Sequence, residues 1–120
     1  MTTKNQQFRT IDLFAGIGGV RKGFEKAGFT TVFANDFESK CEDTYNLNFK
    51  DTPLVIEDLT KVSIEDLPEF DFVLGGFPCQ AFSIAGYRKG FSDEKGRGNL
   101  FFNVADIIEE RKPTGFLLEN

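Results

Sequence analysis

The sequence predicts an α/β domain built on a partial parallel sheet of about five strands, with helices on both faces. Short runs rich in β-branched and aromatic residues alternate with stretches of helical periodicity along the 120 residues. Parallel strands need a crossover connection, which a helix usually provides in a right-handed sense. With 40% hydrophobic residues, the chain can build one modest core, so we expect one domain or part of one.

The first predicted strand extends from Phe8 to Phe14 and leads into a glycine-rich turn. A helix follows from about Gly18, and Gly28 is placed to end it because glycine readily adopts the left-handed conformation found after helices. Its apolar residues recur at i, i+4 and i+7, which predicts one buried face made of Val20, Phe24 and Ala27.

The second predicted strand is Thr30 to Asn35. After it, Phe37, Cys41 and Tyr45 follow one another at four-residue intervals, which predicts a helix with a buried stripe. Cys41 on such a stripe is a packing residue, since free cysteine is among the most buried residue types.

The second half of the chain continues the alternation. The long helix in this half has a broad apolar face, basic residues in its last turn and a stop at Pro113. In chain order we expect a strand at Pro53 to Ile56, a turn or short helix near Ser63 to Leu67, a strand at Phe70 to Leu74, the helix at Asn99 to Arg111, and a strand at Gly115 to Leu118.

Five unusual features each follow a different predicted strand. They are the turn Phe14 to Gly19, Asp36, Asp58, Cys79 and Glu119. The carboxyl ends of parallel strands share one edge of the sheet, and ligands of open α/β sheets bind at that edge, where the strand order reverses. The sequence therefore predicts that these features converge on one site.

Composition excludes several classes of function. The chain has no histidine, so a Cys-His or Ser-His nucleophile pair within it is excluded, and its two cysteines lack the spacing of a disulfide framework or a zinc site. The apolar run Phe70 to Phe77 is too short to cross a bilayer, and Met1 to Thr10 has no signal-peptide core. We expect a cytoplasmic protein with reduced thiols and no metal site.

The net charge of −5 does not carry the basic footprint of a free-standing nucleic-acid binder. The loop Gly86 to Gly98 is a local exception, because four basic residues there face only two acidic ones. It is interpreted either as a phosphate-facing flap or as an ordinary solvated loop. The basic residues are Arg88, Lys89, Lys95 and Arg97.

The glycine turn offers backbone amides and a helix N-terminus to a ligand. Its spacing does not fit the dinucleotide fingerprint, because position 21 is arginine, and this lowers the odds of a nicotinamide enzyme. Asp36 is placed to accept hydrogen bonds from both hydroxyls of a ribose. Its alternative interpretation is a helix N-cap.

Three blocks, in their order and spacing, resemble the cofactor, nucleophile and acid motifs of the DNA (cytosine-5)-methyltransferases. They are Asp12 to Gly19, Phe77-Pro78-Cys79-Gln80, and Leu117 to Asn120, where the chain stops. The resemblance covers Phe8 to Asn120 and implies a Rossmann-like S-adenosylmethionine-dependent methyltransferase fold.

The resemblance implies S-adenosylmethionine as cofactor. Asp36 would bind its ribose, and Phe37 would lie against its adenine ring unless it is core. Asp58 would accept from the adenine amino group; the alternative is that it is surface charge, like its neighbours Asp51 and Glu57. The residues implied in cofactor binding are Phe14, Ala15, Gly16, Ile17, Gly18, Gly19, Asp36, Phe37, Asp58, Leu59, Pro78 and Leu100.

The resemblance also implies covalent catalysis on a cytosine flipped out of double-stranded DNA. The Cys79 thiolate would add to C6 and make C5 nucleophilic, while Glu119, in a dry pocket beside the thiol, would protonate or hydrogen-bond N3. Alone, a terminal Glu-Asn would be taken for solvated surface. The residues implied in contact with the DNA or the flipped base are Gln80, Ser83, Arg88, Lys89, Arg97 and Asn120.

Family enzymes continue well beyond this length, so residues 1–120 are expected to be the N-terminal part of a catalytic domain that lacks the target recognition domain. Such a chain would be inactive alone, and its partner would be the missing C-terminal part or a complementing subunit. Three alternatives stay open: an RNA (tRNA) cytosine-5 methyltransferase, a non-catalytic interaction module of the same fold, and an oxidoreductase.

Overall fold

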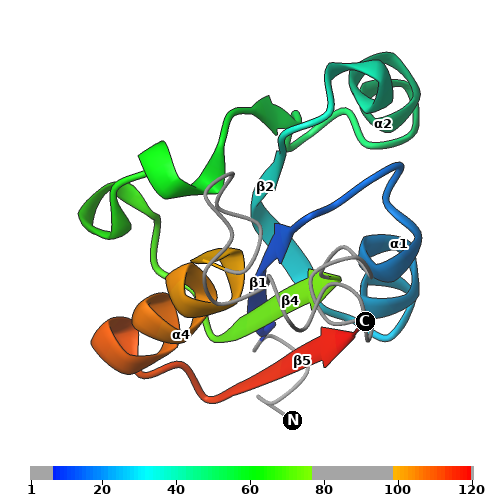
Figure 1. Ribbon diagram of the computed structural model, residues 1–120. Coiled ribbons are helices and arrows are strands. Elements are labelled where there is room, and N and C mark those ends of the chain that lie inside the picture. The colour runs from blue at the N-terminus through cyan, green and yellow to red at the C-terminus, as the bar shows by residue number, and fades with distance from the viewer. Residues whose placement is uncertain (1–6, 77–98, 120) are drawn as a thin grey trace, which may run out of the picture.

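The computed structural model describes residues 7–76 and 99–119, which form a five-stranded parallel sheet with helices on both faces (Figure 1). This confirms the predicted fold class. The strands are β1 (Arg9–Leu13), β2 (Thr30–Asp36), β3 (Val55–Ile56), β4 (Phe72–Gly76) and β5 (Gly115–Glu119). The helices are α1 (Gly19–Lys26), α2 (Glu42–Asn48) and α4 (Asn99–Arg111), with short 3₁₀ helices η2 (Ser39–Cys41), η3 (Leu59–Lys61) and η4 (Ile64–Asp66).

The strand order is β3-β2-β1-β4-β5, so β2 and β3 lie on one side of β1, and β4 and β5 lie on its other side. The strand order therefore reverses between β1 and β4, and open α/β sheets bind ligands at the point of reversal. Leu13 pairs with Asn35 on one side and with Gly75 on the other, and Gly75 in turn pairs with Leu118. The carboxyl ends of these four strands therefore lie at one level.

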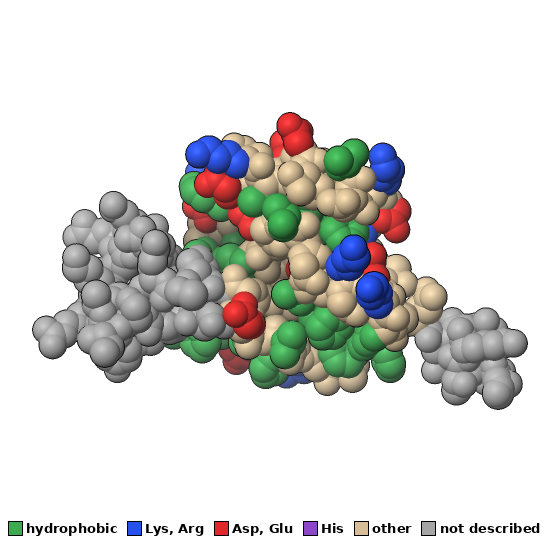
Figure 2. All heavy atoms as spheres, turned by 90° about the vertical axis from the view of Figure 1, so that its right-hand side faces the viewer, with side chains coloured by type: hydrophobic (Ala, Val, Ile, Leu, Met, Phe, Trp, Pro, Cys, Tyr) green, Lys and Arg blue, Asp and Glu red, His purple; other side chains and the backbone are tan. Residues whose placement is uncertain are grey.

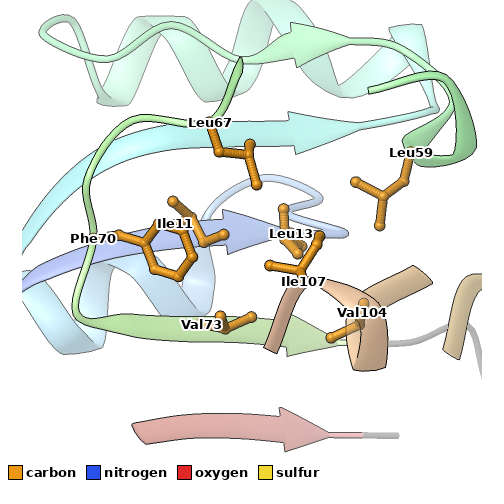
Figure 3. Close-up of a cluster of buried hydrophobic side chains, with 8 residues drawn as sticks. All are labelled: Ile11, Leu13, Leu59, Leu67, Phe70, Val73, Val104 and Ile107. Atoms are coloured by element: carbon orange, nitrogen blue, oxygen red, sulfur yellow. The ribbon is translucent and has the colours of Figure 1, made fainter. Parts of the chain in front are cut away.

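The larger core cluster lies between the sheet and α4 (Figure 3). Alternate residues of β1 and β4 point to this face, as the period of two in a strand requires. Fully burying one such aliphatic side chain is worth about 1.5–3 kcal/mol. The cluster consists of Ile11, Leu13, Leu59, Leu67, Phe70, Val73, Val104 and Ile107.

Helix α1 lies on the opposite side of the sheet from α4 (Figure 1), and its predicted apolar face is wrong in part. Val20 and Ala27 are exposed, whereas Arg21 is fully buried. The buried guanidinium is compatible with this position because Glu25 and Asp51 pair with it. Gly28, at φ +101°, follows the helix as predicted.

The predicted helix through Phe37, Cys41 and Tyr45 begins later than expected. The chain first forms the 3₁₀ turn η2, and α2 begins at Glu42, where two acidic residues in its first turn favour the positive end of the helix dipole. Phe37 therefore precedes the helix and is exposed. Cys41 is half-buried and Tyr45 fully buried, and both contact a second core cluster with Ala34, Phe49 and Leu54.

Strand β3 pairs over two residues instead of the predicted four. Pro53 has no N–H to donate to a ladder, so the first predicted pairs cannot form. The turn predicted at residues 63–67 appears as η4, and η3 precedes it. Within the described ranges, no helix is long and apolar enough to span a membrane.

Candidate functional site

The turn between β1 and α1 is built from residues in left-handed backbone conformations. Phe14, Gly16 and Gly18 have φ values of +55°, +58° and +96°. The Ala15 N–H donates to the Asn35 carbonyl at 3.1 Å, and the Gly18 N–H donates to the Ala15 carbonyl at 2.9 Å. These bonds shape the turn so that it ends at the N-terminus of α1, which no side chain caps.

The turn is open on its outer side. A Cβ added at Gly16 or at Gly19 would meet no atom within 4 Å. The amides of the first helical turn have no partner within a helix and carry partial positive charge. An open main-chain cradle of this kind suits a ligand that approaches the backbone closely.

Asp36, the last residue of β2, holds this turn. Its Oδ2 accepts from the Gly16 N–H at 2.8 Å, and its Oδ1 accepts from the Glu38 N–H at 2.7 Å. The second bond is a local turn contact, and the N-cap of the following 3₁₀ helix is Glu38. A carboxylate offers about four lone-pair sites, so each oxygen of Asp36 retains one for a ligand.

Phe37 follows directly after this carboxylate and is 74% exposed. The alternative that Phe37 is a core residue is therefore wrong. Ile17, in the glycine turn, is also largely exposed. Two apolar side chains thus stand in solvent on the two segments that the Gly16–Asp36 hydrogen bond joins.

Asp58 and Leu59 lie near the same edge, because the Glu57 N–H donates to the Asp36 carbonyl at 3.0 Å. Asp58 caps η3, and its Oδ1 accepts from the Thr60 N–H at 2.9 Å and from the Thr60 hydroxyl at 2.7 Å. These bonds lower the pKa of Asp58. Leu59 is buried in the larger core cluster, so packing accounts for it and we leave it out of the site.

Glu119 ends β5 opposite Gly76, the last residue of β4. A Cβ on Gly76 would lie 3.2 Å from Glu119 Oε1, so glycine leaves room for this carboxylate. Glu119 is exposed, which differs from the dry pocket that we expected. Next to Gly76 in β4, a Cβ added to Gly75 would lie 3.9 Å from the Phe14 ring. The Phe14 ring is half-buried against the larger core cluster.

The structure thus brings the glycine turn, Asp36, Asp58 and Glu119 to the carboxyl ends of neighbouring strands. Leu100, in the first turn of α4, is half-buried against the larger core cluster. The remaining candidates lie outside the described residues: Pro78, Cys79, Gln80, Ser83, Arg88, Lys89, Arg97 and Asn120.

Sequence reasoning missed the buried polar residues beneath this edge. The Asn35 side-chain amide donates to the carbonyls of Val55 at 2.9 Å and Glu57 at 3.0 Å, so it fixes the segment that carries Asp58. Asp12 and Arg21 are also buried. One signal was available for Asp12, since an acid inside an apolar strand must find partners.

Figure 2 shows the surface on the side of the molecule where α1 lies. Among the described residues in this view, Lys and Arg side chains are scattered between acidic and apolar ones and form no single basic patch. This distribution agrees with the net charge of −5.

Comparison with known proteins gives a consistent result. A sequence profile of the C-5 cytosine-specific DNA methylase family matches residues 8–120. The Type II methyltransferase M.Bsp6I of Bacillus sp. (strain RFL6) is 50% identical over 109 residues, which cover 90% of this chain and 34% of that protein. M.NgoBI of Neisseria gonorrhoeae is 48% identical over 113 residues, covering 94% and 34%. The chain spans about a third of the length of these relatives.

Solved structures show the same fold. A prophage-encoded DNA modification methyltransferase from E. coli matches with a TM-score of 0.74 and 30% identity over 93% of this chain and 31% of that one. Spodoptera frugiperda DNMT2 matches with a TM-score of 0.71 and 24% identity over 93% and 35%. Since the family profile matches nearly the whole sequence, this chain belongs to the C-5 cytosine-specific DNA methylase family.

Proposed function

We propose that this chain is the N-terminal part of the catalytic domain of a DNA (cytosine-5)-methyltransferase, which transfers a methyl group from S-adenosylmethionine to C5 of cytosine in DNA. The main observation behind the proposal is that the glycine turn, Asp36 and Glu119 lie at the carboxyl ends of β1, β2 and β5. These strands lie on both sides of the point between β1 and β4 where the strand order reverses. Membership of the family supports it.

The family and fold imply a methyl donor, and the residues present fit S-adenosylmethionine. The turn at Gly16 to Gly19 is open, the Asp36 carboxylate has acceptor sites left, and Phe37 offers an exposed aromatic face. When bound, the cofactor supplies a methyl group on a positively charged sulfur. In our proposal the turn binds the methionyl end, Asp36 binds the ribose, Phe37 contacts the adenine, and Asp58 completes the adenine contacts.

In our proposal, the residues that react with the cytosine come from the carboxyl ends of the neighbouring strands β4 and β5. Cys79 comes three residues after the last residue of β4, and Glu119 ends the neighbouring strand. The Cys79 thiolate adds to C6 of the cytosine, and Glu119 holds a proton at N3, so that the ring electrons move to C5. Once C5 carries the methyl group, the C5 proton passes to water and its bonding electrons re-form the C5=C6 bond. The bond between Cys79 and C6 then breaks to release the thiolate, and the N3 proton returns to Glu119, so that the aromatic ring is restored.

We assign the DNA contacts to Gln80, Ser83, Arg88, Lys89, Arg97 and Asn120, which lie in or next to the segment that carries Cys79. The target carbon is inaccessible inside a duplex, so the base must be flipped out at a cost of a few kcal/mol. A net charge of −5 is unfavourable for binding the DNA phosphates. A C-terminal segment or a complementing subunit is therefore the partner that we propose.

Affinity for S-adenosylhomocysteine tests the cofactor assignment. We expect the protein to bind it and Asp36→Asn to bind about tenfold more weakly or worse, since a hydrogen bond to a charged group is worth about 1.5–3 kcal/mol. Asp66→Asn is the matched control, because Asp66 is exposed on η4. Isothermal titration calorimetry gives both dissociation constants. Equal affinities in the two variants would contradict the assignment, and thermal protection by a nicotinamide cofactor alone would favour an oxidoreductase.

A further inference from the structure

Beneath the glycine turn lies a chain of buried polar side chains to which the proposed reaction gives no role. Asp12 on β1, Arg21 on α1 and Tyr45 on α2 are each at most 2% exposed. They come from three different elements on the α1 side of the sheet. Charged groups are seldom buried this deeply unless other groups pair with them.

Hydrogen bonds join these residues into one network. The Tyr45 hydroxyl donates to Asp12 Oδ2 at 2.8 Å, and Arg21 Nη1 donates to the Tyr45 oxygen at 3.2 Å. Arg21 Nη1 also donates to the Thr52 carbonyl at 2.9 Å, while Nη2 donates to Asp51 Oδ1 at 2.9 Å and Nε to Glu25 Oε2 at 2.7 Å. The network therefore ties β1, α1, α2 and the loop after α2 together.

Phe49 connects this network to the turn. The Arg21 guanidinium carbon lies 4.4 Å from the centre of the Phe49 ring, which also packs against Tyr45 at 4.9 Å between ring centres. The ring also lies against Gly18, because a Cβ added there would overlap Phe49 Cε2. Gly18 has a φ of +96°, a left-handed conformation that glycine adopts readily, so the ring lies against the left-handed end of the turn.

Besides its main-chain hydrogen bonds, two side chains contact the turn: the Asp36 carboxylate at Gly16 and the Phe49 ring at Gly18. Well-packed apolar residues often stabilise a core as much as a buried ionic network does. What a fixed polar network adds is a single arrangement of the elements that it joins. In this molecule those elements carry the glycine turn.

We propose that Asp12, Tyr45, Arg21 and Phe49 are positioning residues, which hold the Gly18 end of the turn in the conformation that receives the methyl donor. This inference rests on the proposed function for its ligand. The four residues act through Gly18 and touch no reacting atom. They belong to the binding step and not to methyl transfer itself.

Two variants test the proposal against a matched control. Tyr45→Phe removes the hydroxyl that joins Asp12 to Arg21 and keeps the ring, whereas Phe49→Leu removes the ring that contacts Gly18. Ile107→Val is the control, because Ile107 is buried in the larger core cluster on the opposite face of the sheet. It removes one methyl group and leaves the network intact.

The first measurement is amide hydrogen exchange in the whole chain without ligand. The Gly18 N–H reports on the turn through its bond to Ala15, and the Ile107 N–H reports on global unfolding. We expect Gly18 exchange to be about tenfold faster in Tyr45→Phe and Phe49→Leu, as the loss of one buried interaction would allow, and unchanged in Ile107→Val. Unchanged Gly18 exchange, or acceleration that merely follows Ile107 in all variants, would overturn the proposal.

The second measurement is the dissociation constant for S-adenosylhomocysteine, taken where each variant is folded. We expect it to rise about tenfold in both network variants and to stay constant in Ile107→Val. Equal affinity in all four proteins would overturn the proposal. If the unaltered chain binds no S-adenosylhomocysteine, the proposed function fails, while the exchange of Gly18 still decides whether the network holds the turn.

Discussion

Asp36 connects the strand end to the glycine turn with a single carboxylate. One oxygen accepts from Gly16 and the other from Glu38, so the side chain is oriented before any ligand arrives. A group oriented in advance loses less conformational entropy on binding. A substitution at Asp36 is therefore expected to change both the shape of the turn and the proposed contact with a ribose. The test above uses Asn because it retains one acceptor oxygen.

At Cys79, replacement by serine is expected to abolish methyl transfer and to leave affinity for S-adenosylhomocysteine unchanged, because in the proposed mechanism the thiolate acts only on the base. Tritium transfer from S-adenosylmethionine to duplex DNA measures activity in a reconstituted enzyme, and a covalent adduct with a 5-fluorocytosine duplex should disappear in the variant. Cys41→Ser is the control, since Cys41 is half-buried against the second core cluster. Turnover by Cys79→Ser, or loss of activity only in Cys41→Ser, would contradict the assignment of the nucleophile.

Asp12 predicts an unusual dependence of stability on pH. Burial, partly offset by the Tyr45 hydrogen bond and Arg21 and reinforced by Asp36 and Glu25, raises its pKa from 3.8 to about 7. Between these values the folded protein keeps a proton that the unfolded chain has lost, so this group makes stability fall as pH rises towards 7 and level off above it. The pKa of Asp58 is lowered by its hydrogen bonds from Thr60, and that of Asp71, just before β4, by hydrogen bonds from Arg9, so these two groups change stability only in more acidic solution.

Urea denaturation from about pH 5 to about pH 8 measures this dependence. Asp12→Asn should remove most of the decline, because an amide does not titrate. A decline of the same size in Asp12→Asn would assign it to another group.

At the scale of elements, hydrophobic periodicity predicted each of the three α-helices that the structure describes but not always its buried face. In α1 the pattern of Val20, Phe24 and Ala27 pointed to one face, whereas the structure buries Arg21. The reason is that the partners of Arg21 lie far along the chain, at Tyr45, Asp51 and Thr52, and a local window cannot include them. Tertiary contacts outweighed the local pattern at this position.

Helix α4 is anchored at the end opposite to the site. The Arg111 guanidinium donates to the carbonyls of Ile64 at 2.9 Å, Leu67 at 3.1 Å and Pro68 at 3.0 Å, and it lies 5.1 Å from the centre of the Phe70 ring. These bonds join the C-terminal end of α4 to the segment around η4. Leu100, at the other end of the helix, is half-buried against the larger core cluster.

Arg111→Met should lower the free energy of unfolding by about 1–3 kcal/mol, since three carbonyls lose a charged donor while most of the apolar stem is retained. Chemical denaturation gives this value. Lys112→Met next to it is the control, because Lys112 is exposed. If both variants lost the same free energy of unfolding, the hydrogen bonds from Arg111 to the three carbonyls would not account for the loss.

For the whole molecule, the alternation of elements was sufficient to predict the fold class, and the strand-end rule was sufficient to bring Asp36, Asp58 and Glu119 to one edge. The exposure of Phe37 and Glu119 was not predictable, because exposure depends on which segments cover a strand end. The network under the turn also escaped prediction. Asp12 and Tyr45 are 33 residues apart, and sequence spacing does not show that they meet.

Strand β5 lies at one edge of the sheet. In the part of the chain that the structure describes, β5 pairs only with β4, and two of its apolar residues, Phe116 and Leu117, are 55% and 45% exposed. An edge strand with exposed apolar side chains readily pairs with another segment. Relatives are about three times as long as this chain, so they contain sequence that could cover this edge.

We therefore predict that residues 1–120 alone are catalytically silent and only marginally stable, and that the remaining C-terminal segment of the 50%-identical relative, supplied as a separate chain, restores methylation. The physical reason is that the edge of β5 gains backbone partners and the DNA gains the cationic contacts that a net charge of −5 does not provide. Mixing the two chains and measuring tritium transfer to duplex DNA checks this, with the Cys79→Ser chain in the same mixture as the control for activity of the added segment. Methylation by residues 1–120 alone would show that neither edge pairing nor added DNA contacts are needed.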